Sequence, residues 1–172
     1  MKLLRAPHRS GDGITTIFLS QGEFTQVDSV DDELAEFNWS VYVNRGCRYA
    51  FRKVGGRKGK KVILHREIAA RMGLDLTNEI DHVDGNGLNN RRNNLRAATT
   101  AQNQRNQGID RRNKSGVKGV WWVGSQQKWR AGITVDRKRY YLGSFSSKED
   151  AAAAYDMAAA RLHGEFARPN GQ

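Results

Sequence analysis

The chain has 172 residues, enough for two or three small modules but too few for two large domains. Its formal net charge of +11 favours a polyanionic partner, nucleic acid before membrane. The single cysteine, Cys47, excludes an intramolecular disulfide and the paired thiolates of a structural zinc site, and no apolar run approaches the roughly 18 residues of a membrane span. We therefore expect a soluble cytoplasmic protein without structural zinc.

The charge is unevenly distributed along the chain. Residues 1–40 contain three basic and seven acidic residues, a net charge of −4, so the remainder carries +15. We expect the binding surface after residue 40.

The first sixty residues predict a small, mostly β module. Residues 14–19 and 23–27 indicate a hairpin around Gln21-Gly22, because both runs are rich in Ile, Thr, Phe and Val. A short helix should follow, capped by Ser29, and residues 41–53 alternate weakly, as in a pair of strands.

Residues 54–61 form a basic, glycine-rich loop with two interpretations. Its cations could reach DNA phosphates, or it could be a solvated hairpin tip. Apolar residues at helical spacing then predict an amphipathic helix over residues 65–72, ended by Gly73. A lone histidine at a helix start, here His65, usually packs or caps, and catalysis is the less favoured alternative.

The segment from Glu79 to Asn103 contains the side chains of a metal-assisted phosphodiester hydrolase. A hard cation such as Mg²⁺ prefers oxygen ligands, which the Asp81 carboxylate and the Asn103 carboxamide can supply. His82 would then serve as a base for the attacking water. Two metals would need more carboxylates, so one ion is favoured.

The order of residues around this pair predicts two short strands and a helix. Asp81 and His82 are neighbours that must address one phosphate, so they should lie at a strand end. Residues 84–87 supply a tight turn, and Thr99 with Gln102 predicts the start of a helix that carries Asn103.

Residues 63–106 resemble the HNH endonucleases, specifically phage and intron homing enzymes, in the motifs Leu-His-Arg, Asp-His-x-Asp-Gly-Asn, Asn-Asn-Leu-Arg and Thr-x-x-Gln-Asn. The resemblance implies that Asp81 and Asn103 hold one Mg²⁺ or Mn²⁺ ion per active site and that His82 is the general base. It also implies that Asn94 fixes the loop and orients His82 by hydrogen bonding.

Two features depart from this family. No cysteine pairs frame the motif, and Thr100 lies where some homing enzymes place a lysine near the metal. A cation that assists the transition state would then come from Arg92, Arg96 or Arg105.

Residues 109–115 read as a basic linker, because they lack periodicity and are rich in positive charge. The side chains expected to follow a DNA backbone in and beside it are Arg111, Arg112, Lys114 and Lys118.

The last segment predicts a three-stranded sheet packed on one helix. Residues 117–123, 128–135 and 139–142 have strand character, and Ser146 with Glu149 indicates a capped helix over residues 147–162. Its many alanines would let this helix lie close to the sheet. If alternate residues of the middle strand face the helix, the others face outward with cations and aromatics.

Residues 116–170 resemble the Apetala or ethylene-response-factor type of DNA-binding domain in Lys-Trp-Arg-Ala, Tyr-Leu-Gly-Ser-Phe and His-Gly-Glu-Phe-Ala. The resemblance implies that the sheet enters the major groove. We expect Trp122 to pack in the core; for Trp121, core and contact remain open. Gly132 and Thr134 replace a plant glutamate and arginine, so the plant recognition sequence does not transfer. The implied contacts are Trp121, Val123, Arg130, Thr134, Arg139 and Tyr141.

We therefore predict an α+β protein with a β-rich region (1–60), an HNH core (61–108), a basic linker (109–115) and a DNA-reading domain (116–172). It would be a site-specific homing endonuclease, located in the host cytoplasm if phage-encoded. Its partner would be double-stranded DNA, with no membrane or small-molecule substrate, and it would act as a monomer or weak dimer. The alternative is a DNA-binding transcriptional regulator with a non-catalytic HNH scaffold. An RNA target is disfavoured, because the major groove of A-form RNA is deep and narrow.

Overall fold

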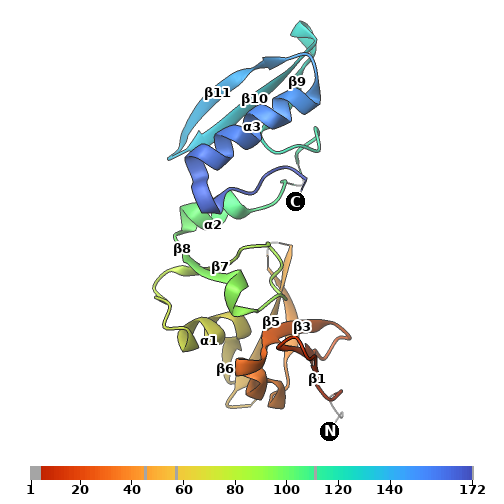
Figure 1. Ribbon diagram of the computed structural model, residues 1–172, viewed down its shortest axis with the longest axis vertical. Helices are drawn as coiled ribbons and strands as arrows, with labels where there is room; N and C mark the ends of the chain where they lie inside the picture. Colours follow the sequence, from red (N-terminus) through yellow and green to blue (C-terminus); the bar gives the residue numbers. More distant parts are fainter. Residues whose placement is uncertain (1–4, 45, 57, 111, 172) are drawn as a thin grey trace. The chain divides into compact units, whose positions relative to one another are not determined.

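The computed structural model describes residues 5–44, 46–56, 58–110 and 112–171. These residues form helices and small antiparallel sheets, which confirms the predicted α+β class (Figure 1). The chain divides into two compact units, one up to Thr99 and one from Thr100 onward. None of the described helices is long and apolar enough to cross a membrane.

The first unit begins with a three-stranded antiparallel sheet. Its strands are β1 (His8–Arg9), β2 (Ile14–Phe18) and β3 (Phe24–Asp28), and β2 and β3 form the predicted hairpin. The helix expected after it is a 3-10 helix, η1 (Ser29–Glu36). The Ser29 side chain was expected to cap this helix, but the cap position is Asp28, which makes no side-chain capping bond.

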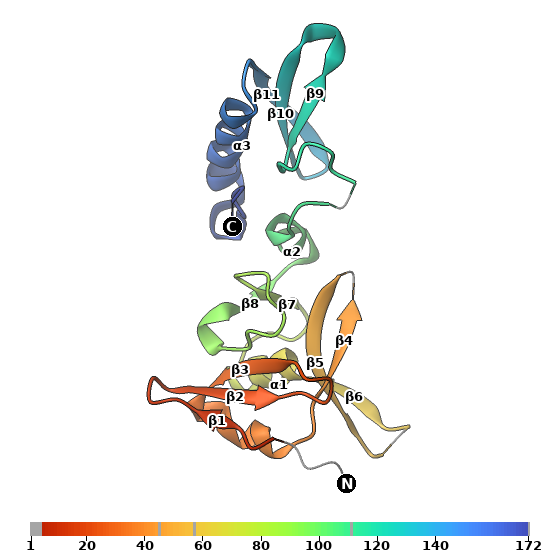
Figure 2. The ribbon, with the colours of Figure 1, turned by 90° about the vertical axis from the view of Figure 1, so that its right-hand side faces the viewer.

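A second antiparallel sheet follows, in the order β4-β5-β6 (Figure 2). The predicted strand pair is β4 (Ser40–Asn44) and β5 (Cys47–Val54), and β6 (Lys60–Ile63) extends the sheet. The basic segment 54–61 is therefore a hairpin with a short tip rather than a long loop. Gly55 and Gly56 occupy the tip at positive φ.

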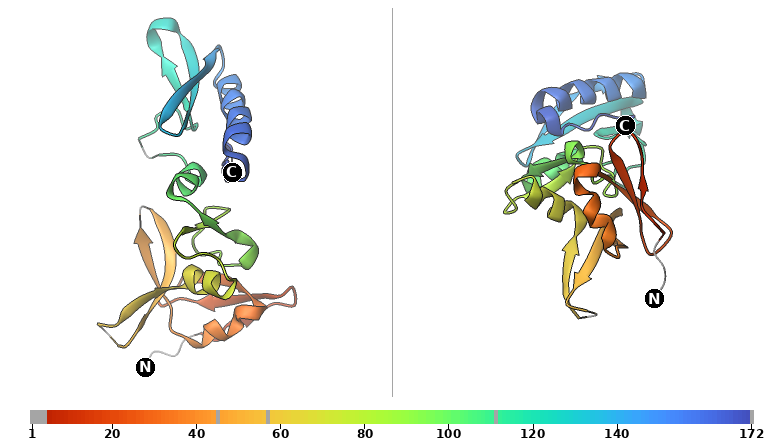
Figure 3. Two further views of the ribbon diagram at one scale, coloured as in Figure 1. Left: turned by 90° about the vertical axis from the view of Figure 1, so that its left-hand side faces the viewer. Right: turned by 60° about the horizontal axis from the view of Figure 1, so that its bottom comes forward.

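The HNH segment contributes α1 (Leu64–Arg71), which packs against β5 and β6 (Figure 3), and the hairpin of β7 (Glu79–His82) and β8 (Leu95–Ala98). A short 3-10 turn, η2 (Arg92–Asn94), leads into β8. One hydrophobic core joins this segment to the sheets before it, so residues 1–60 and the HNH hairpin fold around a common centre. Its fully buried members include Val27, Leu34, Trp39, Leu64 and Ile68.

Ion pairs explain the acidic character of the first forty residues. Asp31 is fully buried, and Arg92 donates to both of its carboxylate oxygens at 2.7 and 2.9 Å. Asp28 accepts from the Arg91 side chain at 3.0 Å and from the Arg92 backbone at 2.7 Å. A buried charge is costly unless it is paired, so these carboxylates hold the basic HNH loop against the first sheet.

The second unit begins with α2 (Thr100–Asn106) and continues with a sheet in the order β11-β10-β9. Helix α3 (Lys148–His163) lies across one face of this sheet, as predicted (Figure 1). The core between them is formed by small and medium side chains, including Val120, Ala131, Ile133, Ala151 and Tyr155. The remaining elements are β9 (Val120–Val123), η3 (Gly124–Gln126), β10 (Lys128–Val135), β11 (Lys138–Phe145) and η4 (Gly164–Phe166).

The cap of α3 differs from the prediction by one residue. The Ser147 side chain, not that of Ser146, accepts a hydrogen bond from the Asp150 backbone N–H at 3.0 Å. The Ser146 hydroxyl instead accepts from Lys128 at 2.9 Å. Consecutive serines made the two positions equivalent in sequence, and the register of β11 selected between them.

Ser147→Ala should therefore lower the free energy of unfolding of the second unit by about 1 kcal/mol, because it removes the N-cap bond of α3. Ser146→Ala is the matched control and should change stability by less than about 0.5 kcal/mol, as is usual for exposed sites. Urea denaturation measures both. Equal effects of the two changes would contradict the cap assignment.

Candidate functional site

Asp81 and His82 form the end of β7, as the sequence predicted. Both side chains are buried, with 4% and 5% exposure. The register of the hairpin places Asp81 opposite Arg96 and His82 opposite Leu95. The strand ends at His82, and a turn begins at Val83. After His82 the side chains therefore no longer alternate between the two faces of a strand.

A buried chain of hydrogen bonds holds the His82 ring. Its Nε2 lies 3.1 Å from Asn90 Oδ1, and the Asn90 amide donates to Thr25 Oγ1 at 2.7 Å. The Thr25 hydroxyl in turn donates to the Leu88 carbonyl at 2.7 Å. Asn90 and Thr25 are fully buried, so the chain links the imidazole to β3.

Sequence reasoning missed Asn90 and Thr25. Residues 86–94 contain five asparagines, and no local pattern distinguishes the one that meets the ring. Thr25 lies in a different sheet, 65 residues from Asn90. The only available signal was that a threonine at a core position of β3 needs a polar partner.

Asn94 fixes the loop between β7 and β8, as expected for the middle residue of the motif. Its Oδ1 accepts from the Asp84 backbone at 3.0 Å, and its amide donates to the Asp84 carboxylate at 2.9 Å and to the Asn89 carbonyl at 2.8 Å. The bond to the His82 ring that we expected from Asn94 comes from Asn90. Asn94 therefore acts on the loop.

Aromatic rings surround His82. The His65 ring lies 5.0 Å from it, edge to face, and the Tyr49 ring lies 5.9 Å away. Burial lowers the pKa of His82, with the Asn90 bond opposing the shift, and burial lowers the pKa of His65 to about 3. Both shifts favour the neutral form of the ring. His65 packs, as favoured from sequence.

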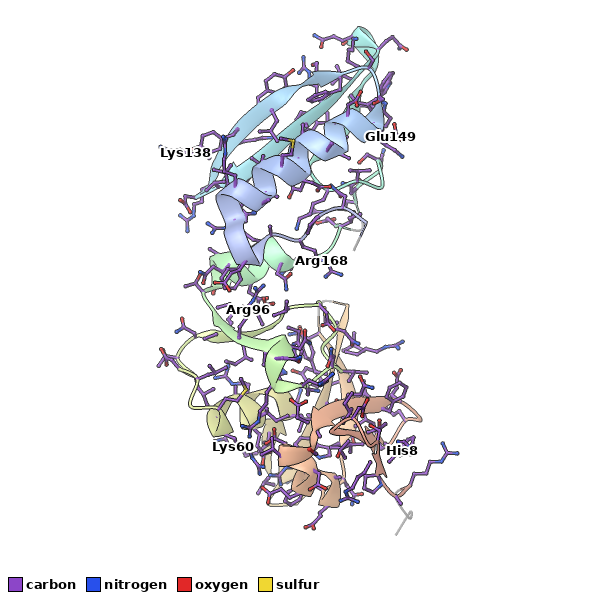
Figure 4. All side chains as sticks on the ribbon, in the orientation of Figure 1. His8, Lys60, Arg96, Lys138, Glu149 and Arg168 are labelled. Atoms are coloured by element: carbon purple, nitrogen blue, oxygen red, sulfur yellow. The ribbon has the colours of Figure 1, made fainter. Side chains whose placement is uncertain are left out.

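Among the three candidate cations, Arg96 is the one that contacts Asp81. It donates to Asp81 Oδ2 through Nε at 2.9 Å, and its Nη2 lies 2.8 Å from the same oxygen (Figure 4 labels Arg96). The other two candidate cations bind elsewhere, Arg92 to Asp31 and Arg105 to Asp136. The register of β7 and β8 explains why Arg96 contacts Asp81, because it places these two residues opposite each other.

The two predicted metal ligands lie in different units. Asp81 offers a buried carboxylate, the kind of donor that a hard divalent cation prefers. Asn103 lies in α2, at the start of the second unit. No three His, Cys, Asp or Glu side chains of the described residues form a metal-binding group, so water would complete the coordination. Magnesium commonly keeps several waters, which suits such a sparse donor set.

The predicted DNA contacts lie on one face of the sheet β9-β10-β11, the face not covered by α3. The Arg139 guanidinium lies 4.2 Å from the centre of the Trp121 ring, and that of Arg130 lies 5.8 Å from the centre of the Tyr141 ring. Tyr141 is 60% exposed, and Thr134 lies opposite Arg139 in the register. This face therefore presents cations and rings together. Its predicted members are Trp121, Val123, Arg130, Thr134, Arg139 and Tyr141.

Two aromatic residues and one glycine shape this sheet. A Cβ on Gly132 would lie 3.2 Å from the Trp121 ring, so the glycine lets the ring lie close to the strand. Trp122 was expected in the core but is 44% exposed, although its ring centre lies 5.1 Å from that of Trp129. Trp122 faces the α3 side, on the edge strand β9, where the helix covers it incompletely.

The predicted backbone-binding cations have different environments. Lys114 and Arg112 are exposed, and Arg112 pairs with Asp110 at 2.9 Å. Arg111 lies outside the described residues. Lys118 was expected to meet DNA, but its ammonium donates to the carbonyls of Arg105 and Gln107, both at 2.7 Å.

Lys118 therefore has a structural role at the end of α2. Burial lowers its pKa to about 8, because desolvation disfavours the charged form. Its two acceptors are backbone carbonyls of the last turn of α2 and the residues after it, which lack partners within the helix. Lys118 thus connects the end of α2, the helix that contains Asn103, to the segment that leads into β9.

Comparison with known proteins identifies the two segments. Residues 61–105 match the HNH endonuclease family, and residues 115–165 match the AP2 domain. The chain therefore contains an HNH endonuclease domain followed by an AP2 domain.

Three relatives are similar to parts of the chain. Protein 3.8 of Escherichia phage T7 is 38% identical over 89 residues, which are 52% of this chain and 73% of that protein. An uncharacterized HNH endonuclease of Acanthamoeba polyphaga mimivirus is 36% identical over 91 residues, 53% of this chain and 46% of that protein. An ethylene-responsive transcription factor-like protein of Arabidopsis thaliana is 46% identical over 43 residues, 25% of this chain and 18% of that protein.

Two buried threonines of the first sheet test the hydrogen-bond chain to His82. Thr25→Val leaves the Asn90 amide without its acceptor and should lower the free energy of unfolding by about 1–3 kcal/mol. Thr15 is equally buried, and among the described residues its hydroxyl has no hydrogen-bond partner, so Thr15→Val should be neutral or stabilising. Urea denaturation of both variants measures the difference, and a reversed order would refute the chain.

The role of Lys118 predicts a second stability difference. Lys118→Met leaves the carbonyls of Arg105 and Gln107 unpaired and should destabilise the second unit by about 1–3 kcal/mol. Lys114→Met removes an exposed charge and should cost less than about 0.5 kcal/mol. Hydrogen exchange of α2 amides should increase only in the first variant. Unchanged exchange in both would argue against the clamp.

Proposed function

We propose that this protein is a site-specific DNA endonuclease of the homing type, which hydrolyses a phosphodiester with His82 as general base. The observation that carries the proposal is the buried His82, which follows the buried Asp81 at the end of β7 and whose ring is held by Asn90. A perturbed histidine next to an acid is typical of a catalytic centre. The match of residues 61–105 to the HNH endonucleases supports the same reaction.

His82 is arranged to accept a proton from water. The Asn90 amide donates to the hydroxyl of Thr25, which leaves Asn90 Oδ1 as an acceptor for the ring. His82 therefore carries its proton on Nε2, and its basic lone pair is on Nδ1. The hydrogen bond also keeps the imidazole from rotating, so the base would be positioned before substrate arrives.

Asp81 and Asn103 would hold the divalent ion, Mg²⁺ or Mn²⁺. When bound, the ion would supply charge stabilisation at the phosphate and the leaving oxygen. Arg96 orients the Asp81 carboxylate through its two contacts to Oδ2, while Oδ1 makes neither of these contacts. Asn94 holds the loop that follows the catalytic pair.

The AP2 sheet would hold the enzyme on duplex DNA. Its arginines suit contacts to bases and phosphates, and its rings suit the apolar edges of bases. We assign base-reading contacts to the face that contains Arg130 and Arg139, and backbone contacts to Arg112 and Lys114. A single core in a monomer would nick one strand, and two cores in a dimer could cut both. The similarity to a phage protein is consistent with action in a host cytoplasm.

A second candidate function is a DNA-binding transcriptional regulator in which the HNH core is a scaffold. The observation that favours it is the AP2 match, together with the similarity to an Arabidopsis transcription factor-like protein. Both functions predict salt-sensitive DNA binding, because phosphate contacts release counterions in each case. Only the endonuclease predicts cutting that needs a metal.

Cleavage of supercoiled plasmid carrying DNA from the neighbourhood of the gene tests the proposal. Wild-type protein should give nicked or linear product with Mg²⁺ and none with chelator, and His82→Ala should slow cleavage by roughly 10²–10⁴-fold, the usual contribution of a general base. Asp81→Asn should raise the Mg²⁺ concentration needed. Tight binding of the plasmid without any cutting would instead support the regulator.

A further inference from the structure

The middle of the first unit has a concentration of positive charge that the nuclease centre and the AP2 domain do not explain. Between Glu36 and Glu67 the chain contains nine Lys or Arg residues and no acidic residue. This stretch forms the sheet β4-β5-β6 (Figure 2). The packing of this small sheet does not by itself require such an excess of basic over acidic residues. The positions of the cations on its two faces therefore bear on their role.

The two faces of the sheet differ in how they use their cations. Arg48 and Arg52 lie on the face that also carries the core residue Ala50. Arg48 pairs with Glu23 at 2.8 Å, and Arg52 pairs with Glu67 at 3.0 Å. These arginines are therefore neutralised by acids of the same unit, and they stabilise its packing.

The other face carries a row of aromatic rings with lysines at its end. Tyr49, Tyr42 and Phe51 form this aromatic row, with ring centres 5.4 Å apart for the first pair and 5.5 Å apart for the second. The Lys61 ammonium lies 2.9 Å from the centre of the Tyr42 ring and 4.7 Å from that of Phe51. Lys53 lies opposite Lys61 in the register, and both lysines are exposed.

The aromatic row begins at the catalytic histidine. The Tyr49 ring centre is 5.9 Å from that of His82 and 5.3 Å from that of His65. Gly87, in the loop after β7, approaches the same strand so closely that a Cβ would collide with the Arg48 carbonyl and the Tyr49 ring. The sheet and the catalytic loop are thus packed together, and the position of this face is fixed relative to the general base.

We propose that this face, formed by Tyr42, Tyr49, Phe51, Lys53 and Lys61, is a second DNA-docking surface that holds the duplex backbone beside His82. The inference rests on the proposed function, because it takes DNA as the substrate. The lysines would bind phosphates, and the rings would pack on deoxyribose. The surface lies in the first unit, so it is separate from the AP2 sheet.

Charge and shape favour duplex DNA as the occupant. The stretch between Glu36 and Glu67 has nine basic and no acidic residues, and such an excess complements a polyanion. Phosphate contacts position a protein on DNA without reading its sequence. The half-buried rings offer flat apolar area of the kind that packs on nucleic acid. A surface next to the general base that reads no sequence is suited to placing a phosphodiester at His82.

Two charge-matched double variants of the full-length chain test the surface. Lys53→Gln/Lys61→Gln removes two charges from the docking face, and Arg48→Gln/Lys60→Gln removes two from the opposite face of the same strands (Figure 4 labels Lys60). Binding to a duplex that carries the cleavage site is measured against salt without metal. The docking-face variant should bind roughly tenfold more weakly, and its salt slope should fall by about 1.8, the value for two phosphate contacts.

The control variant should keep the wild-type slope. Equal weakening by both variants, or weakening by the control alone, would overturn the docking surface and indicate a general effect of charge. Cleavage in Mg²⁺ is followed in parallel. If wild-type protein binds but does not cut, the nuclease proposal fails while the two slopes still decide on the surface. If it cuts and the variants bind alike, only the surface is wrong, and absence of DNA binding by wild-type protein would overturn both proposals.

Discussion

The hydrogen bond between His82 and Asn90 is the interaction around which the first unit is organised. A buried imidazole needs a partner, and the partner must itself be satisfied, which requires Thr25 and the carbonyl of Leu88. The chain of hydrogen bonds thereby connects β7 to β3, whose sheet lies far away in the sequence. The N-terminal region is consequently part of the support of the candidate active site.

Electrostatics strengthens the same connection. The acidic residues of the N-terminal region pair with arginines of the HNH loop, most completely at the buried Asp31. The negative charge of residues 1–40 therefore serves the fold, and the positive charge left over is available for a polyanion. Arg96, in β8, differs from Arg91 and Arg92 because it contacts the Asp81 carboxylate.

In the second unit, the packing of α3 decides which face of the sheet β9-β10-β11 is covered. Alanine-rich α3 lies close to its sheet and covers one face, which leaves the other face to Arg130, Arg139 and Tyr141. Lys118 fastens α2 to the same unit through two backbone carbonyls. The helix that carries Asn103 therefore depends on the fold of the DNA-reading domain for its stability.

The sequence by itself determined the fold class and the β7–β8–α2 order around Asp81 and His82, because strand alternation and motif spacing are local properties. Only the tertiary structure decided which asparagine meets His82, that Lys118 turns inward, that Trp122 is partly exposed and that the cap of α3 is Ser147. The physical reason is that these outcomes depend on register and on contacts between residues distant in the chain. The five asparagines of residues 86–94 have identical side chains, and the hydrogen bond with the distant Thr25 distinguishes Asn90 from the others.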